Sequence, residues 1–155
     1  MGYVEELRNL VGHRPLILVG AVVLLLDQNE RVLLQQRKEP YGKWGLLGGL
    51  MELGESLEET AYREVLEEAG LQIRNIKLIN VFTGKHYFLK LANGDEFQSV
   101  TAAYYTKEFD GEIVTNKEEA LDIKFFPVDE LPDYIVGSHK KIIEEYAKMR
   151  AADLE

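Results

Sequence analysis

The sequence predicts an α/β fold of the α+β type: an α/β/α sandwich with a mixed β-sheet, built as one domain over residues 1–155. Apolar runs of strand length alternate with turn-forming residues, a well-signalled amphipathic helix lies near the middle, and a second helix closes the chain. The 155-residue length suits one domain. The apolar content of 46% is typical of a globular protein and too high for a disordered one.

The order of elements follows from the periodicity of the apolar residues and from the turn signals between them. We expect a short helix, two paired strands, a glycine-rich loop, the central helix, three further strands, a last strand and a final helix. Their expected ranges are 3–11, 16–26, 32–36, 38–55, 57–69, 73–81, 87–91, 97–109, 123–128 and 138–150. Asn93-Gly94 is typical of a hairpin turn between two of these strands.

The central helix has the clearest signals. Ser56 and Glu59 form a capping box at its start, and Gly70 ends it. A core-facing stripe recurs every four residues, at Leu57, Ala61, Val65 and Ala69. We expect this helix on one side of the sheet and the terminal helix on the other. The residues of the terminal helix expected to face the core are Ile142, Ile143, Tyr146 and Ala147.

The charge and the composition exclude several classes of protein. With 18 basic and 27 acidic residues the net charge is −9, which argues against binding to a nucleic-acid polymer or an anionic membrane. The absence of cysteine excludes disulfides and thiolate metal sites. The longest apolar run has 11 residues between Arg14 and Asp27, whereas a membrane span needs about 20. The N-terminus lacks the layout of a signal peptide, so we expect a cytoplasmic location.

Three carboxylates converge on one face of the central helix. Glu64, Glu67 and Glu68 stand at i, i+3 and i+4, and Arg63 is placed to pair with either Glu67 or Glu59. A solvated acidic face is the ordinary interpretation of such a cluster. The alternative is a divalent cation, which would remove the repulsion among them. Oxygen ligands suit Mg²⁺, Mn²⁺ or Ca²⁺, and the three histidines show no ligand spacing.

The residues around this cluster resemble the Nudix box. The pattern is Gly49, five residues, Glu55, seven residues, and then REVLEEAGL from Arg63 to Leu71. Every fixed position of the box and both bulky aliphatic positions are matched. Trp44 also matches a frequent family position, whereas Leu47 stands where the family often has proline, so the loop there lacks the rigidity that a proline would give.

The resemblance implies the α/β/α sandwich of Nudix hydrolases and an activity that uses Mg²⁺ or Mn²⁺. Such enzymes cleave the P–O–P bond of a nucleoside diphosphate linked to another group, by attack of water on phosphorus. Carried over to this chain, metal ligands are the carbonyl of Gly49 and the carboxylates of Glu64, Glu67 and Glu68. Glu55 and Arg63 are expected to form an ion pair that braces the loop and the helix.

The remaining site residues lie outside the box. Arg37 and Lys43 are candidate phosphate contacts or solvated loop charges. The general base is expected to be Glu64 in the box, or Glu118 or Glu119 on a loop that is otherwise an exposed turn. Candidate base-stacking aromatics, with core packing as the alternative, are Tyr41, Phe82, Tyr87, Tyr104 and Tyr105.

Three hypotheses follow. The first is a pyrophosphohydrolase of a small nucleotide such as a nucleoside triphosphate, a nucleotide sugar or ADP-ribose. The second is a catalytically silent Nudix-fold domain that senses a nucleotide, although such domains typically lose box glutamates. The third is an acidic α/β domain with a fortuitous pattern. The apolar stripe of residues 3–11 would serve a homodimer interface or pack on its own sheet.

Overall fold

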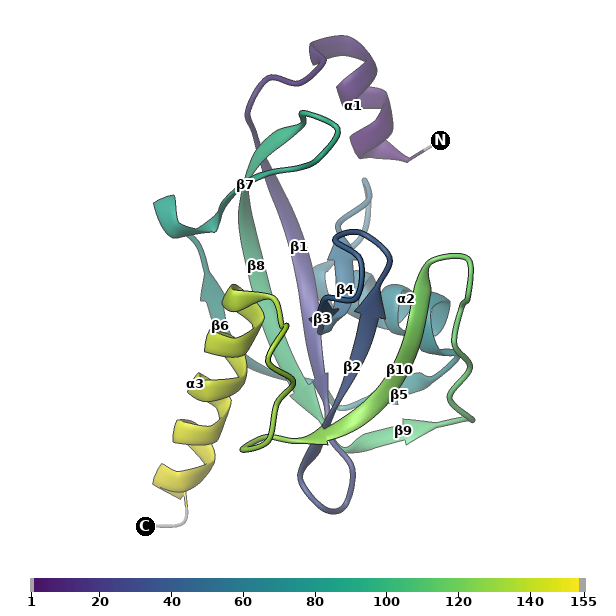
Figure 1. The fold of residues 1–155 in the computed structure, drawn as a ribbon, viewed down its shortest axis with the longest axis vertical. Helices are drawn as coiled ribbons and strands as arrows, with labels where there is room; N and C mark the ends of the chain where they lie inside the picture. Colours follow the sequence, from purple (N-terminus) through teal and green to yellow (C-terminus); the bar gives the residue numbers. More distant parts are fainter. Residues whose placement is uncertain (1, 154–155) are drawn as a thin grey trace.

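A computed structural model describes residues 2–153 of the chain, and Figure 1 shows its arrangement. The helices are α1 (Tyr3–Val11), α2 (Leu57–Ala69), the 3₁₀ turn η1 (Lys85–Tyr87) and α3 (Gly137–Asp153). The strands are β1 (Leu16–Leu25), β2 (Arg31–Arg37), β3 (Trp44–Gly45), β4 (Leu47–Leu50), β5 (Gln72–Arg74), β6 (Lys77–Phe82), β7 (Phe88–Lys90), β8 (Glu96–Thr106), β9 (Glu108–Asp110) and β10 (Ala120–Pro127).

The largest sheet has the order β4-β1-β8-β6, with β7 paired to β8. Its central pair β1 and β8 is parallel and its other pairs are antiparallel, so the predicted mixed sheet is confirmed. The hairpin predicted at Asn93-Gly94 is also confirmed, between β7 and β8. A second sheet has the order β10-β2-β3, and β5 pairs with β9.

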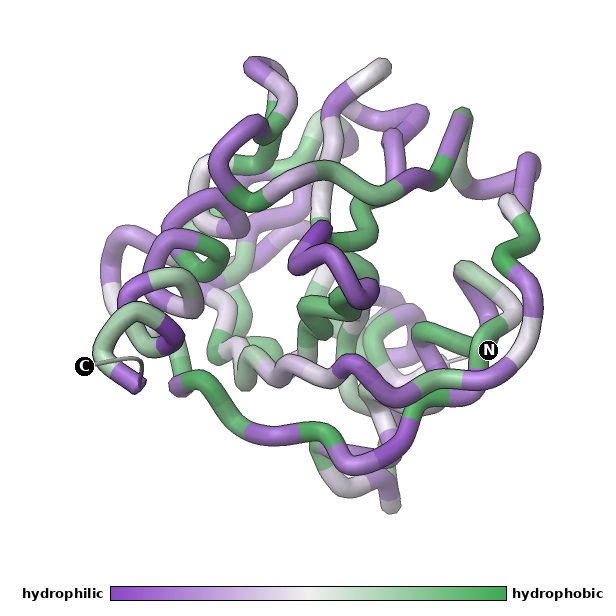
Figure 2. Tube along the Cα trace, turned by 90° about the horizontal axis from the view of Figure 1, so that it is seen from below, coloured by the Kyte–Doolittle hydropathy of each residue, from purple (hydrophilic) through white to green (hydrophobic). Residues whose placement is uncertain are grey.

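Strand β1 carries both halves of the core, because its side chains alternate between its two faces. Ala21, Val23 and Leu25 pack with α2, whereas Val22 and Leu24 pack with α3. The two helices therefore cover opposite faces, as Figure 1 shows and as the sandwich prediction requires. Around the periphery the chain alternates between hydrophobic and hydrophilic stretches (Figure 2), which fits strands with one face toward the core.

One pairing prediction is wrong. Residues 16–26 and 32–36 were expected to pair with each other, but β1 pairs with β4 and β8, whereas β2 pairs with β3 and β10. Only an isolated bridge between Leu26 and Val32 joins the two segments. Both edges of β1 are already occupied, because a strand buried on both faces takes a central place in its sheet.

Two predicted strands are each divided between sheets. The expected strand over 73–81 is two strands, β5 and β6, with Asn75 between them at a φ of 53°. The expected strand over 97–109 likewise breaks between β8 and β9. The break frees β5 and β9 to pair with each other beside the C-terminal end of α2. Apolar residues recur along both segments, so the sequence pattern did not indicate that either strand would break.

Helix α1 packs on its own sheet. The Tyr3 N–H donates to Glu52 at 2.9 Å, and the Arg8 guanidinium donates to the carbonyl of Glu96 at 2.6 Å. Arg8 also lies 3.7 Å from Asp95, so the helix is held against the β7–β8 hairpin. No helix in residues 2–153 is long and apolar enough to cross a membrane.

Candidate active site

The site begins where β4 runs into the loop that leads to α2. Gly48 has a φ of 152°, and a Cβ there would stand 2.1 Å from the Ala21 carbonyl oxygen. At Gly49 a Cβ would stand 2.4 Å from the carboxylate carbon of Glu64. The two glycines thus let β4 lie flat against β1 on one side and let a carboxylate of α2 touch the backbone on the other.

Helix α2 presents the box residues because its ends are fixed as predicted. The Ser56 side chain accepts from the Glu59 N–H, the Glu59 side chain accepts from the Ser56 N–H, and Gly70 takes the left-handed conformation at the C-terminus. The predicted capping box is confirmed. Ala61, Val65 and Ala69 are fully buried, and Glu64 and Glu68 lie on the flank of that apolar stripe. From there Glu68 reaches Gly48 of β4 and Gln35 of β2.

Glu68 is the most buried of the box carboxylates, with 9% of its surface exposed. One of its oxygens accepts from the Gly48 N–H at 2.8 Å, and the other accepts from the side-chain amide of Gln35. Burial raises its pKa to about 8, and the negative charge of Glu64 adds to the rise. These two hydrogen bonds and the charge of Arg37 oppose the shift.

Arg63 joins the loop to the helix. Its Nε donates to Glu55 Oε2 at 2.6 Å, its Nη1 donates to Glu64 at 2.8 Å, and its Nη2 donates to the Leu50 carbonyl. The hydrogen bond from Arg63 lowers the pKa of Glu55 to about 2. The same contacts raise the pKa of Arg63, so both groups stay charged at every ordinary pH.

Glu64 and Glu67 differ in their surroundings. Glu67 is the exposed one, with 55% of its side chain accessible and Arg63 3.4 Å away. Glu64 has 17% of its side chain accessible. Burial raises the pKa of Glu64 despite Arg63, and the charges of Glu67 and Glu119 contribute to the rise. An excess of negative charge is therefore concentrated between α2 and the loop before β10.

The donor chemistry of this region fits an oxygen-preferring divalent cation, since carboxylates that raise one another's pKa are the groups that such an ion neutralises. Their oxygens are not gathered, however. Within residues 2–153 no three acidic or histidine side chains lie close enough together to hold an ion. Glu68 faces Gln35 and Gly48, while Glu64 faces Arg63. The carbonyl oxygen of Gly49 lies against β1, 2.6 Å from where a Cβ on Gly20 would stand.

The two remaining base candidates, Glu118 and Glu119, both lie on the loop before β10 but have different contacts. Glu119 is exposed, and its charge acts on Glu64. The carbonyl of Glu118 accepts from Lys38 at 3.0 Å. Asn116 shapes the turn, because its carbonyl accepts from the Glu119 N–H and its side chain accepts from the Glu118 N–H.

The two candidate phosphate contacts lie at the end of β2 and just before β3. Arg37 ends β2 on the same strand face as Gln35, and Glu68 is the opposite charge that acts on it. Lys43 lies over the ring of Tyr134, 5.4 Å from its centroid. His139 of α3 lies beside both cations, and its Nδ1 accepts from the Leu46 N–H at 3.0 Å.

The aromatic candidates divide between the core and the surface. Tyr104 and Phe82 are buried in the two halves of the core, as the packing alternative predicts, and Tyr105 contacts Tyr146. Tyr87 is partly buried beside Phe82. Tyr41 is 75% exposed. Among these five, Tyr41 therefore keeps the most surface for a ligand, and Tyr87 and Tyr105 are partly exposed.

Two contacts of the site were missed in the sequence. Gln35 is 9% exposed and donates to Glu68, and the Thr60 hydroxyl donates to Glu55 at 3.0 Å. A signal for Gln35 was available: in a strand that alternates, Leu33, Gln35 and Arg37 share one face. A polar residue that follows a core leucine on that face indicates a buried polar partner.

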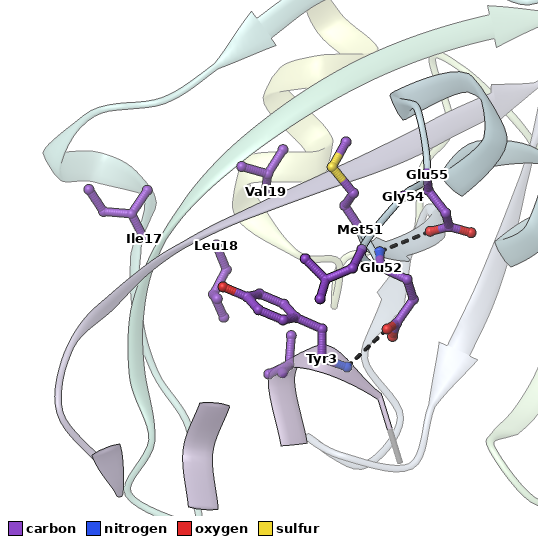
Figure 3. Close-up of a pocket in the computed structure, with 10 residues that line it drawn as sticks. Tyr3, Ile17, Leu18, Val19, Met51, Glu52, Gly54 and Glu55 are labelled. Atoms are coloured by element: carbon purple, nitrogen blue, oxygen red, sulfur yellow. Dashed lines mark hydrogen bonds between the residues drawn. The ribbon is translucent and has the colours of Figure 1, made fainter. Parts of the chain in front are cut away.

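An apolar pocket of about 240 Å³ borders the loop (Figure 3), and Glu68 is not one of the residues that line it. Tyr3 and Val4 of α1 form one wall, and Met51 and Leu53 of the loop form another. Glu55 also lines it, with its carboxylate already engaged by Arg63. The Arg63–Glu55 pair therefore lies between this pocket and Glu64. The pocket is the gap between α1, β1 and the loop.

Comparison with known proteins decides the family. The model of the NUDIX domain matches residues 16–146. The chain belongs to the Nudix family. An NAD-capped RNA hydrolase, NudC, of Klebsiella pneumoniae is 30% identical over 72% of this chain and 40% of that protein. A Bacillus subtilis protein named "Putative 8-oxo-dGTP diphosphatase" is 28% identical over 82% of this chain and 78% of that protein.

Solved structures share the fold. A MutT Nudix hydrolase from Burkholderia pseudomallei superposes with a TM-score of 0.73 and 26% identity, over 84% of this chain and 98% of that one. A UDP-X diphosphatase superposes with a TM-score of 0.66 at 20% identity, over 95% of this chain and 70% of that one. The Nudix chain thus spans less than half of its NudC relative and nearly all of the Burkholderia enzyme. The interpretation as a fortuitous acidic domain is excluded.

Proposed function

We propose that this Nudix chain is a divalent-metal-dependent pyrophosphohydrolase that cleaves the P–O–P bond of a small nucleotide. The observation that carries the proposal is the complete box, folded so that Glu64 touches Gly49 while Glu68 is buried beside it. Burying acidic groups beside one another costs stability unless a ligand compensates for it. That cost supports a site selected for binding a cation rather than for stability.

Glu64, Glu67, Glu68 and the Gly49 carbonyl are the proposed ligands of Mg²⁺ or Mn²⁺. The bound ion would neutralise the charge of the diphosphate and lower the pKa of the attacking water. Arg63 and Glu55 hold the loop and the helix at a fixed separation. Two hydrogen bonds join the Arg63 side chain to the Glu55 carboxylate, and a third joins Arg63 to the Leu50 carbonyl. Gln35 orients Glu68 from β2.

The reaction is substitution at phosphorus. A water oxygen forms the new P–O bond, the bridging P–O bond breaks, and the second phosphate leaves with its electron pair. We propose Glu119 as the base that takes the proton of the water, because its charge acts on Glu64. Arg37 and Lys43 are proposed to contact the phosphates.

The substrate class is a nucleotide with a P–O–P bond. The printed names of the relatives point to two kinds of molecule, an oxidised nucleoside triphosphate and NAD-capped RNA. The net charge of −9 favours the small nucleotide over a polymer. The surface of Tyr41 and Tyr87 is available for a nucleobase. A homodimer and a cytoplasmic location stay predictions.

A product assay by mass spectrometry tests the proposal. Wild-type chain and the Glu68→Gln variant are incubated with Mg²⁺, Mn²⁺ or chelator and a panel of nucleotides. The panel holds 8-oxo-dGTP and ordinary nucleoside triphosphates, ADP-ribose, nucleotide sugars, dinucleoside polyphosphates, coenzyme A and NAD-capped RNA. We expect one class to be cleaved by the wild type in the presence of metal alone. Tight nucleotide binding with no product from any member would overturn the proposal in favour of a silent sensor.

A further inference from the structure

His139 lies in the first turn of α3 and reaches back to Leu46, the residue between β3 and β4. Its Nδ1 accepts from the Leu46 N–H at 3.0 Å, two residues before Gly48. Burial, and then the charges of Arg37 and Lys43, lower the pKa of His139 to about 3. A neutral ring whose Nδ1 accepts must carry its proton on Nε2, so the tautomer of His139 is fixed.

Gly45 brings His139 and Arg37 together. A Cβ at position 45 would stand 3.2 Å from His139 Nδ1, 3.1 Å from Arg37 Nε and 3.2 Å from Arg37 Nη2. Gly45 pairs with Gln35, so its α-carbon lies on the face from which Gln35 reaches Glu68. The side chains of His139 and Arg37 therefore both pack against the α-carbon of Gly45, which has no side chain to separate them.

Strand β3 is itself clamped by the segment that leads into α3. The Trp44 N–H donates to the Tyr134 carbonyl at 3.0 Å, and the Val136 N–H donates to the Trp44 carbonyl at 2.9 Å. Trp44 is 8% exposed and packs edge-on against Phe126. The start of α3, and His139 with it, is thus fixed relative to β3 by backbone hydrogen bonds as well as by its side chain.

The Arg37 guanidinium has donors to spare. Among residues 2–153 no side chain forms an ion pair with it within 4.0 Å, and no hydrogen bond from its side chain is formed. A guanidinium held in place with its planar fork unpaired is suited to a phosphate or diphosphate, which it binds through two parallel hydrogen bonds.

We propose that His139 is a positioning residue: by holding Leu46 and sharing the surface of Gly45, it fixes Arg37 as the contact for the substrate's diphosphate. This inference rests on the proposed function, which gives Arg37 a phosphate. The His139 ring acts through Arg37 and Leu46 and does not itself take part in the reaction. The geometry assigns a role to α3, whose residues the Nudix box does not include.

The sharpest test leaves both side chains in place. Gly45→Ala puts a methyl group against Arg37 and His139, whereas Gly137→Ala, at the start of α3, meets nothing within 4 Å and serves as the matched control. The probe is methylenediphosphonate with Mg²⁺, a diphosphate that cannot be hydrolysed, and its Kd is measured by calorimetry. Gly45→Ala is expected to weaken binding about tenfold, the effect of one charge-assisted contact, and Gly137→Ala to leave it within about twofold.

Two substitutions of His139 distinguish the role of its Nδ1 from that of its Nε2. The side-chain oxygen in His139→Asn can accept from Leu46 in the place of Nδ1, whereas His139→Gln extends past that place. We expect near wild-type binding for His139→Asn and about tenfold weaker binding for His139→Gln. In the Gly45→Ala/Arg37→Gln double variant, binding should be no weaker than in Arg37→Gln alone, because the first change acts through Arg37.

The possible failures are distinguishable. A wild-type chain that binds diphosphonate, with Gly45→Ala unchanged or with additive effects in the double variant, overturns the role of His139 and leaves the proposed function standing. A wild-type chain that neither binds diphosphonate nor hydrolyses any nucleotide overturns the proposed function and this inference together. Thermal unfolding of each variant identifies any that fail to fold, and the Gly45→Ala comparison then decides.

Discussion

The carboxylate of Glu64 lies directly on the α-carbon of Gly49, so close that a Cβ at position 49 would stand 2.4 Å from both its carbon and one oxygen. These two residues are fifteen positions apart in the Nudix box. The contact explains physically why the first fixed position of the box is glycine: any side chain there would displace a carboxylate of the site.

Gly49→Ala should therefore abolish turnover while the protein stays folded. The added methyl group pushes the Glu64 carboxylate aside, and a misplacement of about 1 Å at a catalytic site costs about 100-fold in rate. The measurement is kcat, with thermal unfolding beside it. Gly48→Ala is the contrast, because its Cβ would meet the Ala21 carbonyl oxygen at 2.1 Å and should destabilise the fold itself. Equal activity in Gly49→Ala and wild type would refute the explanation.

The buried Glu68 predicts how stability depends on pH in the absence of metal. Its pKa in the folded chain is about 8, above the ordinary 4.5, so the folded state holds the proton more tightly than the unfolded state. This favourable contribution is complete below about pH 4.5 and is lost as the pH rises toward 8. In chelator, the free energy of unfolding should fall between these values by up to a few kcal/mol.

Glu68→Gln should flatten that pH dependence. The new side chain has no charge to lose, and the Gln35 amide can rotate to accept from it, so the buried hydrogen bonds are kept. Urea unfolding at a series of pH values measures the difference. The exposed Glu144 of α3 supplies the control, Glu144→Gln, which should follow the wild type. A wild-type profile that is flat from pH 5 to 8 would contradict the buried, raised pKa of Glu68.

The ion pair of Glu55 and Arg63 should contribute to stability as well as to the site. Glu55→Gln leaves the partly buried Arg63 with weaker partners, and we expect a loss of about 1–3 kcal/mol in the free energy of unfolding. The pKa of Glu55 is lowered to about 2, so its contribution is present above pH 4.5 and is lost as the pH falls toward 2. If Glu55→Gln unfolds at the same urea concentration as wild type at pH 7, the brace is dispensable.

The two loop glutamates form a matched pair for identifying the base. Glu119→Gln should lower kcat by about 100-fold or more and remove the acid limb of the pH–rate profile, whereas Glu118→Gln should leave both near wild type. Both side chains are exposed, so neither change should alter folding. An unchanged acid limb in Glu119→Gln would transfer the role to Glu64 or to Glu118.

Features that depend on interactions between residues close in sequence, such as the ends of a helix, were predicted correctly. The limits of α2 followed from Ser56, Glu59 and Gly70, because capping acts between neighbours along the chain. The partner of β1 did not follow, since the adjacent apolar strand β2 was an equally plausible neighbour until burial on both faces placed β1 centrally.

The site shows the same division. The box predicted the carboxylates of α2, whose spacing is helical. It did not predict that Gln35 would reach Glu68 from β2, or that His139 would reach Leu46 across 93 positions. His139 was not a candidate for the site, because the three histidines show no ligand spacing. Contacts of this length depend on how the sheets and α3 are assembled, for which a single sequence carries no local pattern.

The most direct test of the account is hydrolysis in H₂¹⁸O, with turnover measured as Mn²⁺ is titrated in. The wild type is compared with Glu68→Gln and with the exposed control Glu144→Gln. We expect one ¹⁸O atom in one phosphate product, turnover that saturates with Mn²⁺ in wild type and Glu144→Gln, and a loss of about 100-fold or more in Glu68→Gln. Equal turnover in Glu68→Gln, or turnover in chelator equal to that in Mn²⁺, would contradict it.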